Sequence, residues 1–202
     1  MLSFLPLLLL LTPALAVPHN GLRLIKTSPT DPGKWYSESE KFSLFVSKHA
    51  HFVDATETPD LESFASKRLA ATSFPDSLSH VDEVNTLIDT VTTTHISDYL
   101  AVYTAYHNRY YRAATGADAA DWLFSTVKDV AKADPKITVE QFTHSAFAQK
   151  SIIARIPGES TDKIVIGAHL DSVGTTTTGR APGADDNASG TVSTLHPPAE
   201  RC

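Results

Sequence analysis

The chain has 202 residues, of which 20% are charged and 42% are hydrophobic, and its formal net charge is −6. This composition is typical of a globular protein and excludes a chain that is disordered along its length. The acidic balance, with no basic stripe, argues against nucleic acid as a partner. The length suffices for one domain with a hydrophobic core and a smaller additional segment.

The N-terminus predicts a secretory signal peptide over residues 1–16. An apolar run over residues 7–11 precedes the pattern A-L-A at residues 14–16, which is typical of a signal cleavage site. A membrane anchor is the alternative, but about 20 apolar residues are needed to span a bilayer. Pro6 and Pro13 bracket a shorter run. We therefore expect a secreted, extracellular protein that contacts no membrane after signal cleavage.

The sequence contains one cysteine, Cys202. A disulfide framework within the chain is excluded, so the protein must fold on its hydrophobic core alone. An unpaired thiol is unusual in a secreted protein, because the extracellular environment is oxidising. In the absence of any signal for assembly, we expect a monomer.

The segment 17–76 is rich in Pro, Ser and Thr and contains one predicted helix, over residues 36–54. Phe42, Phe45 and Val46 recur at helical spacing and predict a short amphipathic helix. The helix start matches a capping box, S-x-x-E, at residues 37–40. The segment is too small for a domain. Its residues alone leave two readings open, a propeptide or an N-terminal arm of the main domain.

Denser helical periodicity begins near residue 77 and predicts helices over residues 80–91, 94–116 and 117–135. We expect Gly116 to end the second helix and Asp134-Pro135 to end the third. The residues expected to share one face of each helix are, in chain order, Val81, Val84, Leu87, Ile88; Ile96, Tyr99, Leu100, Tyr103, Tyr106, Tyr110; and Ala119, Trp122, Leu123, Val127, Val130.

The hydrophobic period then changes to that of strands. Residues 136–144 and 150–158 predict the two strands of a hairpin, connected at residues 144–149. Residues 162–170 hold a continuous apolar run at Ile164–Ile166, which is typical of a strand buried on both faces. Helices followed by such a strand predict an α/β sandwich.

One histidine at the end of this strand and three aspartates after it lie within residues 167–190. His169 lies where the strand should end, at the edge where sites of open α/β sheets gather; a purely structural histidine is the alternative. Asp171 follows two residues later, on the same side of an extended chain, and could receive the second ring N–H of His169. Asp185 and Asp186 are adjacent carboxylates, which repel one another unless a cation or donors offset them; a solvated acidic turn is the alternative.

Histidine and carboxylate together predict a metal site suited to zinc, with cobalt or manganese as alternatives. A bridging carboxylate would allow two metal ions about 3.5–4 Å apart.

A family resemblance adds to this interpretation. IVIGAHLDS, residues 164–172, followed by APGADDNASG, residues 181–190, resembles the metal motif of secreted zinc-dependent leucine aminopeptidases of the fungal extracellular type, in the zinc-exopeptidase family. Residues 106–124 resemble the segment that begins the mature enzyme, and residues 141–158 resemble its first hairpin.

The resemblance implies an α/β fold, an incomplete three-layer sandwich of the zinc-exopeptidase type with an N-terminal signal and a small helical propeptide arm. The implied organisation is a signal peptide at 1–16, a propeptide at 17–76, the N-terminal part of the aminopeptidase domain at 77–192 and an aberrant tail at 193–202. The protein would thus be made as a secreted zymogen. Its substrates would be peptides, from which zinc-activated water releases N-terminal, leucine-like residues.

The resemblance also implies a role for each residue of the motif. His169 would be a ligand of one zinc ion, and Asp186 would bridge two. Asp171 would orient His169, and Asp185 would support the ligands from behind. A cis peptide bond between Asp186 and Asn187 is expected, since members of the family often have one there.

The sequence departs from the family after residue 192. The family continues into adjacent glutamates, one a general base and one a zinc ligand, whereas this chain reads STLHPPAERC and contains no Glu-Glu pair. No catalytic residue is therefore expected in these 202 residues, and we expect the C-terminally truncated chain to be inactive. The alternatives are a non-catalytic pseudo-enzyme, a propeptide-type inhibitor or binder, and a simple metal-binding secreted protein.

Overall fold

The structure, a computed structural model, describes residues 21–48, 51–66, 76–161 and 163–195. The expected signal peptide lies outside these ranges, and so do residues 196–202 of the expected tail. The chain divides into two compact units, residues 1–73 and 74–202, each with its own secondary structure. Within the described ranges, no helix has the length and apolar character needed to cross a membrane.

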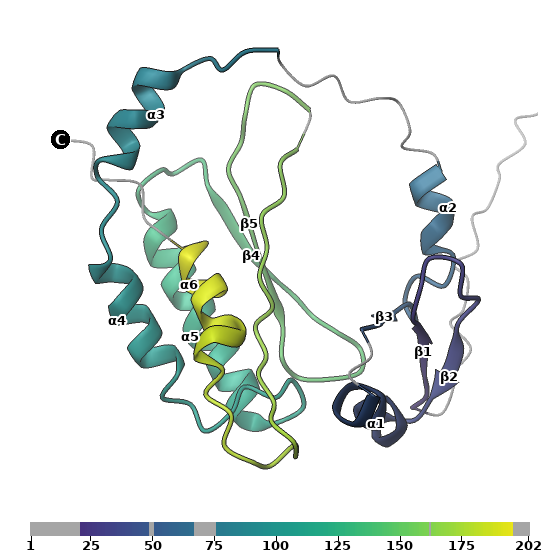
Figure 1. Cartoon of the computed structure of the whole chain (residues 1–202). Helices are drawn as coiled ribbons and strands as arrows, with labels where there is room; N and C mark the ends of the chain where they lie inside the picture. Colours follow the sequence, from purple (N-terminus) through teal and green to yellow (C-terminus); the bar gives the residue numbers. More distant parts are fainter. Residues whose placement is uncertain (1–20, 49–50, 67–75, 162, 196–202) are drawn as a thin grey trace, which may run out of the picture. The chain divides into compact units, whose positions relative to one another are not determined.

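The first unit is a small antiparallel sheet with two helices (Figure 1). Its elements are β1 (Arg23–Lys26), β2 (Lys34–Tyr36), α1 (Glu38–Lys48), β3 (Val53–Asp54) and α2 (Leu61–Ser66). The strand order is β2-β1-β3. The sequence predicted only a helix in this unit, because strands of two to four residues are too short for alternation to be recognised.

The helix α1 begins as predicted, and its buried face matches the expected one only in part. The backbone N–H of Ser37 donates to Glu40 Oε2 at 2.8 Å, and the N–H of Glu40 donates back to Ser37 Oγ at 3.3 Å, so the capping box is confirmed. The expected apolar face was right only in part, because Phe42 and Val46 are half-buried but Phe45 is exposed, and Leu44 is the buried residue. The sheet against which α1 packs selects the buried face, and the sequence did not reveal that sheet.

Two ion pairs join segments of this unit that are far apart in the sequence. Arg23 Nε lies 2.7 Å from Asp54 Oδ2, and Lys26 Nζ lies 2.7 Å from Glu62 Oε2. Burial raises the pKa of Asp54, but hydrogen bonds from Arg23 and Thr56 outweigh it and lower the pKa below its usual value. The hydrogen bond from Lys26 likewise lowers the pKa of Glu62.

We expect the first unit to lose stability in acid. A carboxylate whose pKa is lower in the folded state stabilises the fold above its unfolded pKa, about 4, and this contribution is lost as the pH falls through the folded-state value. Hydrogen exchange of the full chain, corrected for intrinsic rates, should show protection of β1 and β3 falling between pH 5 and pH 3. In the Glu62→Gln variant this pH dependence should be weaker, and an unchanged profile in that variant would argue against the ion pair as the cause.

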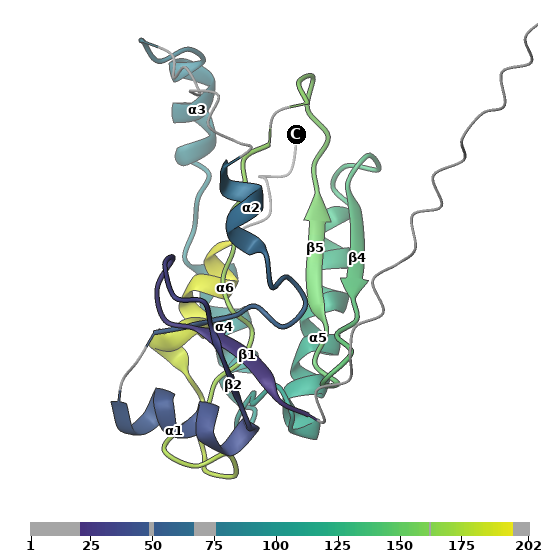
Figure 2. The ribbon, with the colours of Figure 1, turned by 90° about the vertical axis from the view of Figure 1, so that its right-hand side faces the viewer.

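The second unit contains a hairpin and helices that surround one core. Its elements are α3 (Val81–Ile88), α4 (Thr94–Tyr103), α5 (Ala114–Ala131), β4 (Thr138–Phe142), β5 (Ser151–Arg155), an irregular turn (Ala184–Ser189) and α6 (Gly190–Ser193). The hairpin lies alongside α5 (Figure 2). Its antiparallel register, with Thr138 opposite Arg155 and Phe142 opposite Ser151, confirms the predicted hairpin.

The core of this unit forms where α4, α5 and the segment around α6 meet. Its buried apolar residues are Tyr103, Ala119, Leu123, Val127, Ala188 and Leu195. Three of them, Ala119, Leu123 and Val127, lie on the face that helical spacing predicted for α5. Leu195 falls within the expected tail, yet it packs into this core.

The predicted second helix is shorter than its periodicity indicated. It ends at Tyr103, and Gly116 lies inside α5 instead of ending α4. A Cβ at Gly116 would overlap the carbonyl oxygen of Tyr110, so the glycine allows the connection between α4 and α5 to lie against the helix. Close approach of two backbones, and not helix termination, explains this residue.

The predicted strand over residues 162–170 is absent from the part of it that the structure describes, residues 163–170. Ile164, Val165 and Ile166 are 95%, 87% and 79% exposed, so the expectation of a strand buried on both faces was wrong. A buried strand needs partner strands and two covering layers, and the described sheets, β2-β1-β3 and β4-β5, do not pair with this segment. The described fold is therefore mixed α/β and lacks the parallel central sheet of a three-layer sandwich.

The apolar face predicted for the first helix of this unit is also uncovered. The helix itself is present as α3, but Val81, Val84, Leu87 and Ile88 are all exposed. Hydrophobic periodicity predicted the helix correctly, because the period is a local property. Burial of the face depends on a partner surface that periodicity does not specify.

Candidate metal site

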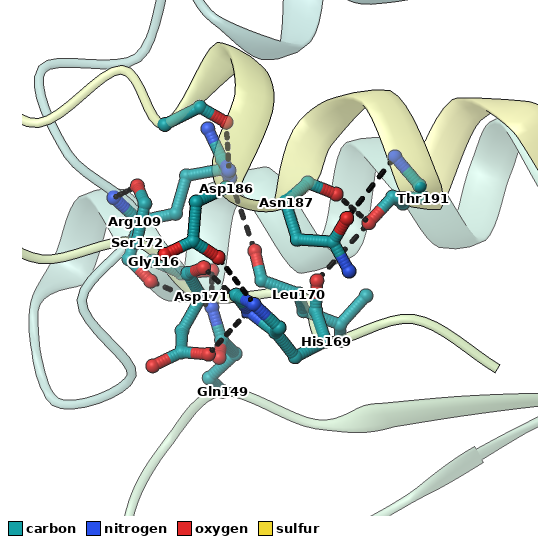
Figure 3. A network of polar contacts seen from close by, with 12 residues as sticks. Arg109, Gly116, Gln149, His169, Leu170, Asp171, Ser172, Asp186, Asn187 and Thr191 are labelled. Atoms are coloured by element: carbon teal, nitrogen blue, oxygen red, sulfur yellow. Dashed lines mark hydrogen bonds and ion pairs between the residues drawn. The ribbon is translucent and has the colours of Figure 1, made fainter.

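The motif residues come together at the start of α6. His169 follows the extended segment, and Asp186 lies in the irregular turn before α6, 17 residues later. His169 Nε2 lies 2.8 Å from Asp186 Oδ1, and His169 Nδ1 lies 3.2 Å from Asp171 Oδ1 (Figure 3). The imidazole is therefore held between two carboxylates, one at each ring nitrogen.

The two carboxylates favour the protonated imidazole. The hydrogen bond with Asp171 is the largest cause, partial burial opposes it, and together with the contact to Asp186 the result is a pKa of His169 raised to about 9. Both ring nitrogens of an imidazolium donate, one to each carboxylate. A metal ion at Nε2 would have to displace that proton, so metal binding at this site should strengthen as the pH rises.

The backbone of the turn is irregular at the aspartate pair. The peptide bond between Asp186 and Asn187 is cis, as the resemblance led us to expect. Thr191 Oγ1 lies 3.0 Å from both the His169 and Asn187 carbonyl oxygens, which links the two loops behind the site. Asp185 is exposed, and its backbone carbonyl accepts a hydrogen bond from Ser189 Oγ.

The donor atoms suit a divalent cation, although the set is small. Imidazole nitrogen and carboxylate oxygen are both common ligands of zinc. The side chains of His169 and Asp186 are 50% and 83% exposed, so an ion can reach them from solvent. Across the described residues, no group of three or more His, Cys, Asp or Glu side chains could hold a metal ion. The residues fit one part of a coordination sphere, and further ligands would have to complete it.

Several polar residues that sequence reasoning missed support the site from behind. The buried ones are Asn108, Arg109, Gln149, Ser172 and Thr191. Tyr103 OH also donates to the Leu170 carbonyl at 2.9 Å, and burial raises the pKa of Tyr103 to about 12. Ser172 ends the first quoted motif and Thr191 follows the second, whereas Asn108, Arg109 and Gln149 belong to connections that carry no catalytic motif. The only signal in the sequence was an arginine, at position 109, within a run of aromatic residues.

Comparison with known proteins shows which family the chain resembles. A family model described as peptidase family M28 matches residues 151–197. The "probable leucine aminopeptidase" of Trichophyton verrucosum is 37% identical over 88% of this chain and 49% of its own length. "Leucine aminopeptidase 1" of Aspergillus niger is 36% identical over 88% of this chain and 46% of its own length. The chain is homologous to the leucine aminopeptidases of peptidase family M28.

Solved structures also resemble the chain. The aminopeptidase LapA of Legionella pneumophila superposes with a TM-score of 0.65 and 26% identity, covering 80% of this chain and 46% of LapA. LapB of the same organism gives a TM-score of 0.62 and 25% identity, covering 87% of this chain and 51% of LapB. This chain thus spans about half the length of the relatives it matches.

Proposed function

We propose that this chain is the N-terminal part of a secreted zinc aminopeptidase that releases leucine-like residues from the N-termini of peptides. The observation that carries the proposal is the placement of His169 between Asp171 and Asp186, at 3.2 and 2.8 Å. Homology to leucine aminopeptidases supports the reaction and the substrate class. In this proposal residues 1–16 direct secretion and residues 17–76 form the propeptide of a zymogen.

Each residue of the motif has a different proposed role in holding the metal. Asp171 accepts the Nδ1–H of His169, so that on loss of the other proton the Nε2 lone pair would be available to a metal ion. His169 and Asp186 would then hold the zinc ion. Asp185 adds negative charge beside the ligands. When bound, zinc would polarise the scissile carbonyl and lower the pKa of an attacking water.

The 202 residues leave the catalytic machinery incomplete. Hydrolysis by metal-activated water also needs a general base, and the sequence contains no adjacent glutamates of the kind the resemblance implies for that role. Aminopeptidase activity is therefore proposed for a protein of the relatives' full length. The 202 residues alone are proposed to bind metal without turnover.

A titration of the 202-residue chain, after signal removal, tests this proposal. Isothermal titration with Zn²⁺ should show saturable binding that strengthens from pH 6.5 to pH 8.5, because the proton at His169 competes with the metal. Leucyl-p-nitroanilide should remain uncleaved at all zinc concentrations. Zinc-dependent cleavage would overturn the proposed inactivity. Absence of zinc binding at any pH would overturn the metal site and favour the non-catalytic alternatives.

A further inference from the structure

Arg109 is a fully buried cation behind the proposed metal site. Arg109 lies in the connection between α4 and α5 and is 0% exposed. Burying a charged group is costly unless its donors find acceptors. Here the guanidinium bonds to backbone carbonyls, from Nε to Leu170 at 3.0 Å, from NH2 to Gly183 at 3.2 Å, and from NH1 to Pro182 and Tyr103. The guanidinium carbon also lies 4.3 Å from the centre of the Tyr103 ring.

These carbonyls belong to the two loops that carry the motif. Leu170 stands between His169 and Asp171, and Pro182 and Gly183 stand just before the aspartate pair. One planar group therefore bonds to both loops (Figure 3). The Leu170 carbonyl points inward to Arg109, which holds the backbone next to His169. The His169 side chain faces the other loop.

Two neighbouring features adapt the second loop to this arrangement. Gly183 has a positive φ of 52°, and a Cβ there would lie 2.6 Å from Ser172 Cβ and 3.0 Å from Arg109 NH2. Ser172 Oγ donates to the Ala181 carbonyl at 2.6 Å and accepts from the Arg109 backbone N–H at 3.1 Å. The guanidinium and the Ser172 hydroxyl thus each join the two loops, in addition to the link through Thr191.

The positive charge of Arg109 is attracted by the carboxylates of the site, but the guanidinium forms its hydrogen bonds with backbone oxygens. Burial lowers the pKa of the guanidinium, and attraction by Tyr103, Asp171 and Asp186 opposes that effect. The hydrogen bonds of the guanidinium to the loops go to backbone oxygens, so the carboxylate oxygens of Asp171 and Asp186 that contact His169 stay available to it.

We propose that Arg109 is a positioning residue that sets the separation between His169 and Asp186 by binding the backbones of both loops. This inference rests on the proposed function for its consequence, since the separation matters for holding a metal ion. Lysine could not replace arginine, because its single ammonium cannot present a planar fork to two loops at once. Arg109 acts through the loops and does not touch the metal or the substrate.

The test compares Arg109→Lys with Arg180→Lys in the 202-residue chain. Arg180 is an exposed arginine of the same second loop and serves as the matched control. Three quantities are measured, namely zinc affinity by titration, hydrogen exchange of residues 168–173 and 181–186, and the urea midpoint. Loss of a supporting residue behind a metal ligand typically costs about 10–100-fold in affinity. We expect Arg109→Lys to lower zinc affinity in that range and to speed exchange in both loops, with Arg180→Lys unchanged.

Ser172→Ala keeps the guanidinium and removes only the hydroxyl link, so it provides a milder variant if Arg109→Lys does not fold. It should speed exchange in both loops and lower zinc affinity less than Arg109→Lys. A folded Arg109→Lys, or Ser172→Ala in its place, with wild-type exchange in the loops would overturn the inference. An equal loss of zinc affinity in Arg109→Lys and Arg180→Lys would also overturn the inference. If the unsubstituted chain binds no zinc, the proposed function fails, whereas the exchange measurement still decides whether Arg109 holds the loops.

Discussion

Asp186→Asn should lower the zinc affinity of the chain at least about 10-fold, in the range typical of groups at a metal centre, and Asp185→Asn should lower it less. The two aspartates are adjacent in the sequence and differ in what they reach. Asp186 Oδ1 lies 2.8 Å from His169 Nε2, and Asp185 is exposed within the same turn. Removing either charge changes the local field by a similar amount, so the comparison separates direct ligation from simple attraction.

Zinc titration at pH 8.5 measures both variants, with paramagnetic shifts from Co²⁺ identifying the residues nearest the ion. His169→Gln should match Asp186→Asn, since each removes one of the two proposed ligands. Equal losses in the Asp185→Asn and Asp186→Asn variants would mean that the acidic turn attracts cations without a defined site. That result would restore the solvated-turn alternative for the aspartate pair.

Gly116→Ala should destabilise the second unit, although alanine is the better helix former. Inside a helix, replacing glycine by alanine ordinarily gains about 1 kcal/mol. At Gly116 the new methyl group would overlap the Tyr110 carbonyl oxygen and lie 3.0 Å from the Arg109 carbonyl oxygen. Both oxygens belong to backbone that carries the buried Arg109, so they have little freedom to move. Overpacking of a tight contact costs about 1–3 kcal/mol or more, and we expect a net loss of at least about 1 kcal/mol.

Urea unfolding followed by far-ultraviolet circular dichroism measures this loss. Gly158→Ala is the matched control, because Gly158 is exposed and a Cβ there would meet nothing within 4 Å. That variant should stay within about 0.5 kcal/mol of the unsubstituted chain, as surface substitutions usually do. A Gly116→Ala chain as stable as the control would mean that the connection before α5 can shift away.

Parts of this architecture follow from short-range patterns. Alternation over residues 136–158 predicted the hairpin, and helical spacing predicted α5 with Ala119, Leu123 and Val127 facing inward. The capping box at the start of α1 was also recognised. Each of these depends on residues close together in the chain, where propensity and hydrogen bonding act without a distant partner.

The proposed site was accessible from the sequence only in part. The motif identified His169, Asp171 and Asp186 as a group, and the structure brings all three into contact. Nothing local indicated that Arg109, some 60 residues earlier, would bond to the backbone beside them. Every residue has a backbone carbonyl, so the amino-acid type does not reveal which carbonyls accept hydrogen bonds. A residue that binds only backbone therefore cannot be found from a sequence motif.

The sequence by itself determined the hairpin, the periodic helices, the cluster of potential metal ligands and the resemblance to leucine aminopeptidases. The tertiary structure alone decided that Ile164–Ile166 is exposed, that Gly116 serves a close backbone contact, and that Arg109 bonds to both loops of the motif. The physical reason is the range of the interactions. Periodicity and capping are satisfied between near neighbours, whereas burial and backbone recognition depend on which distant segments supply the opposing surface.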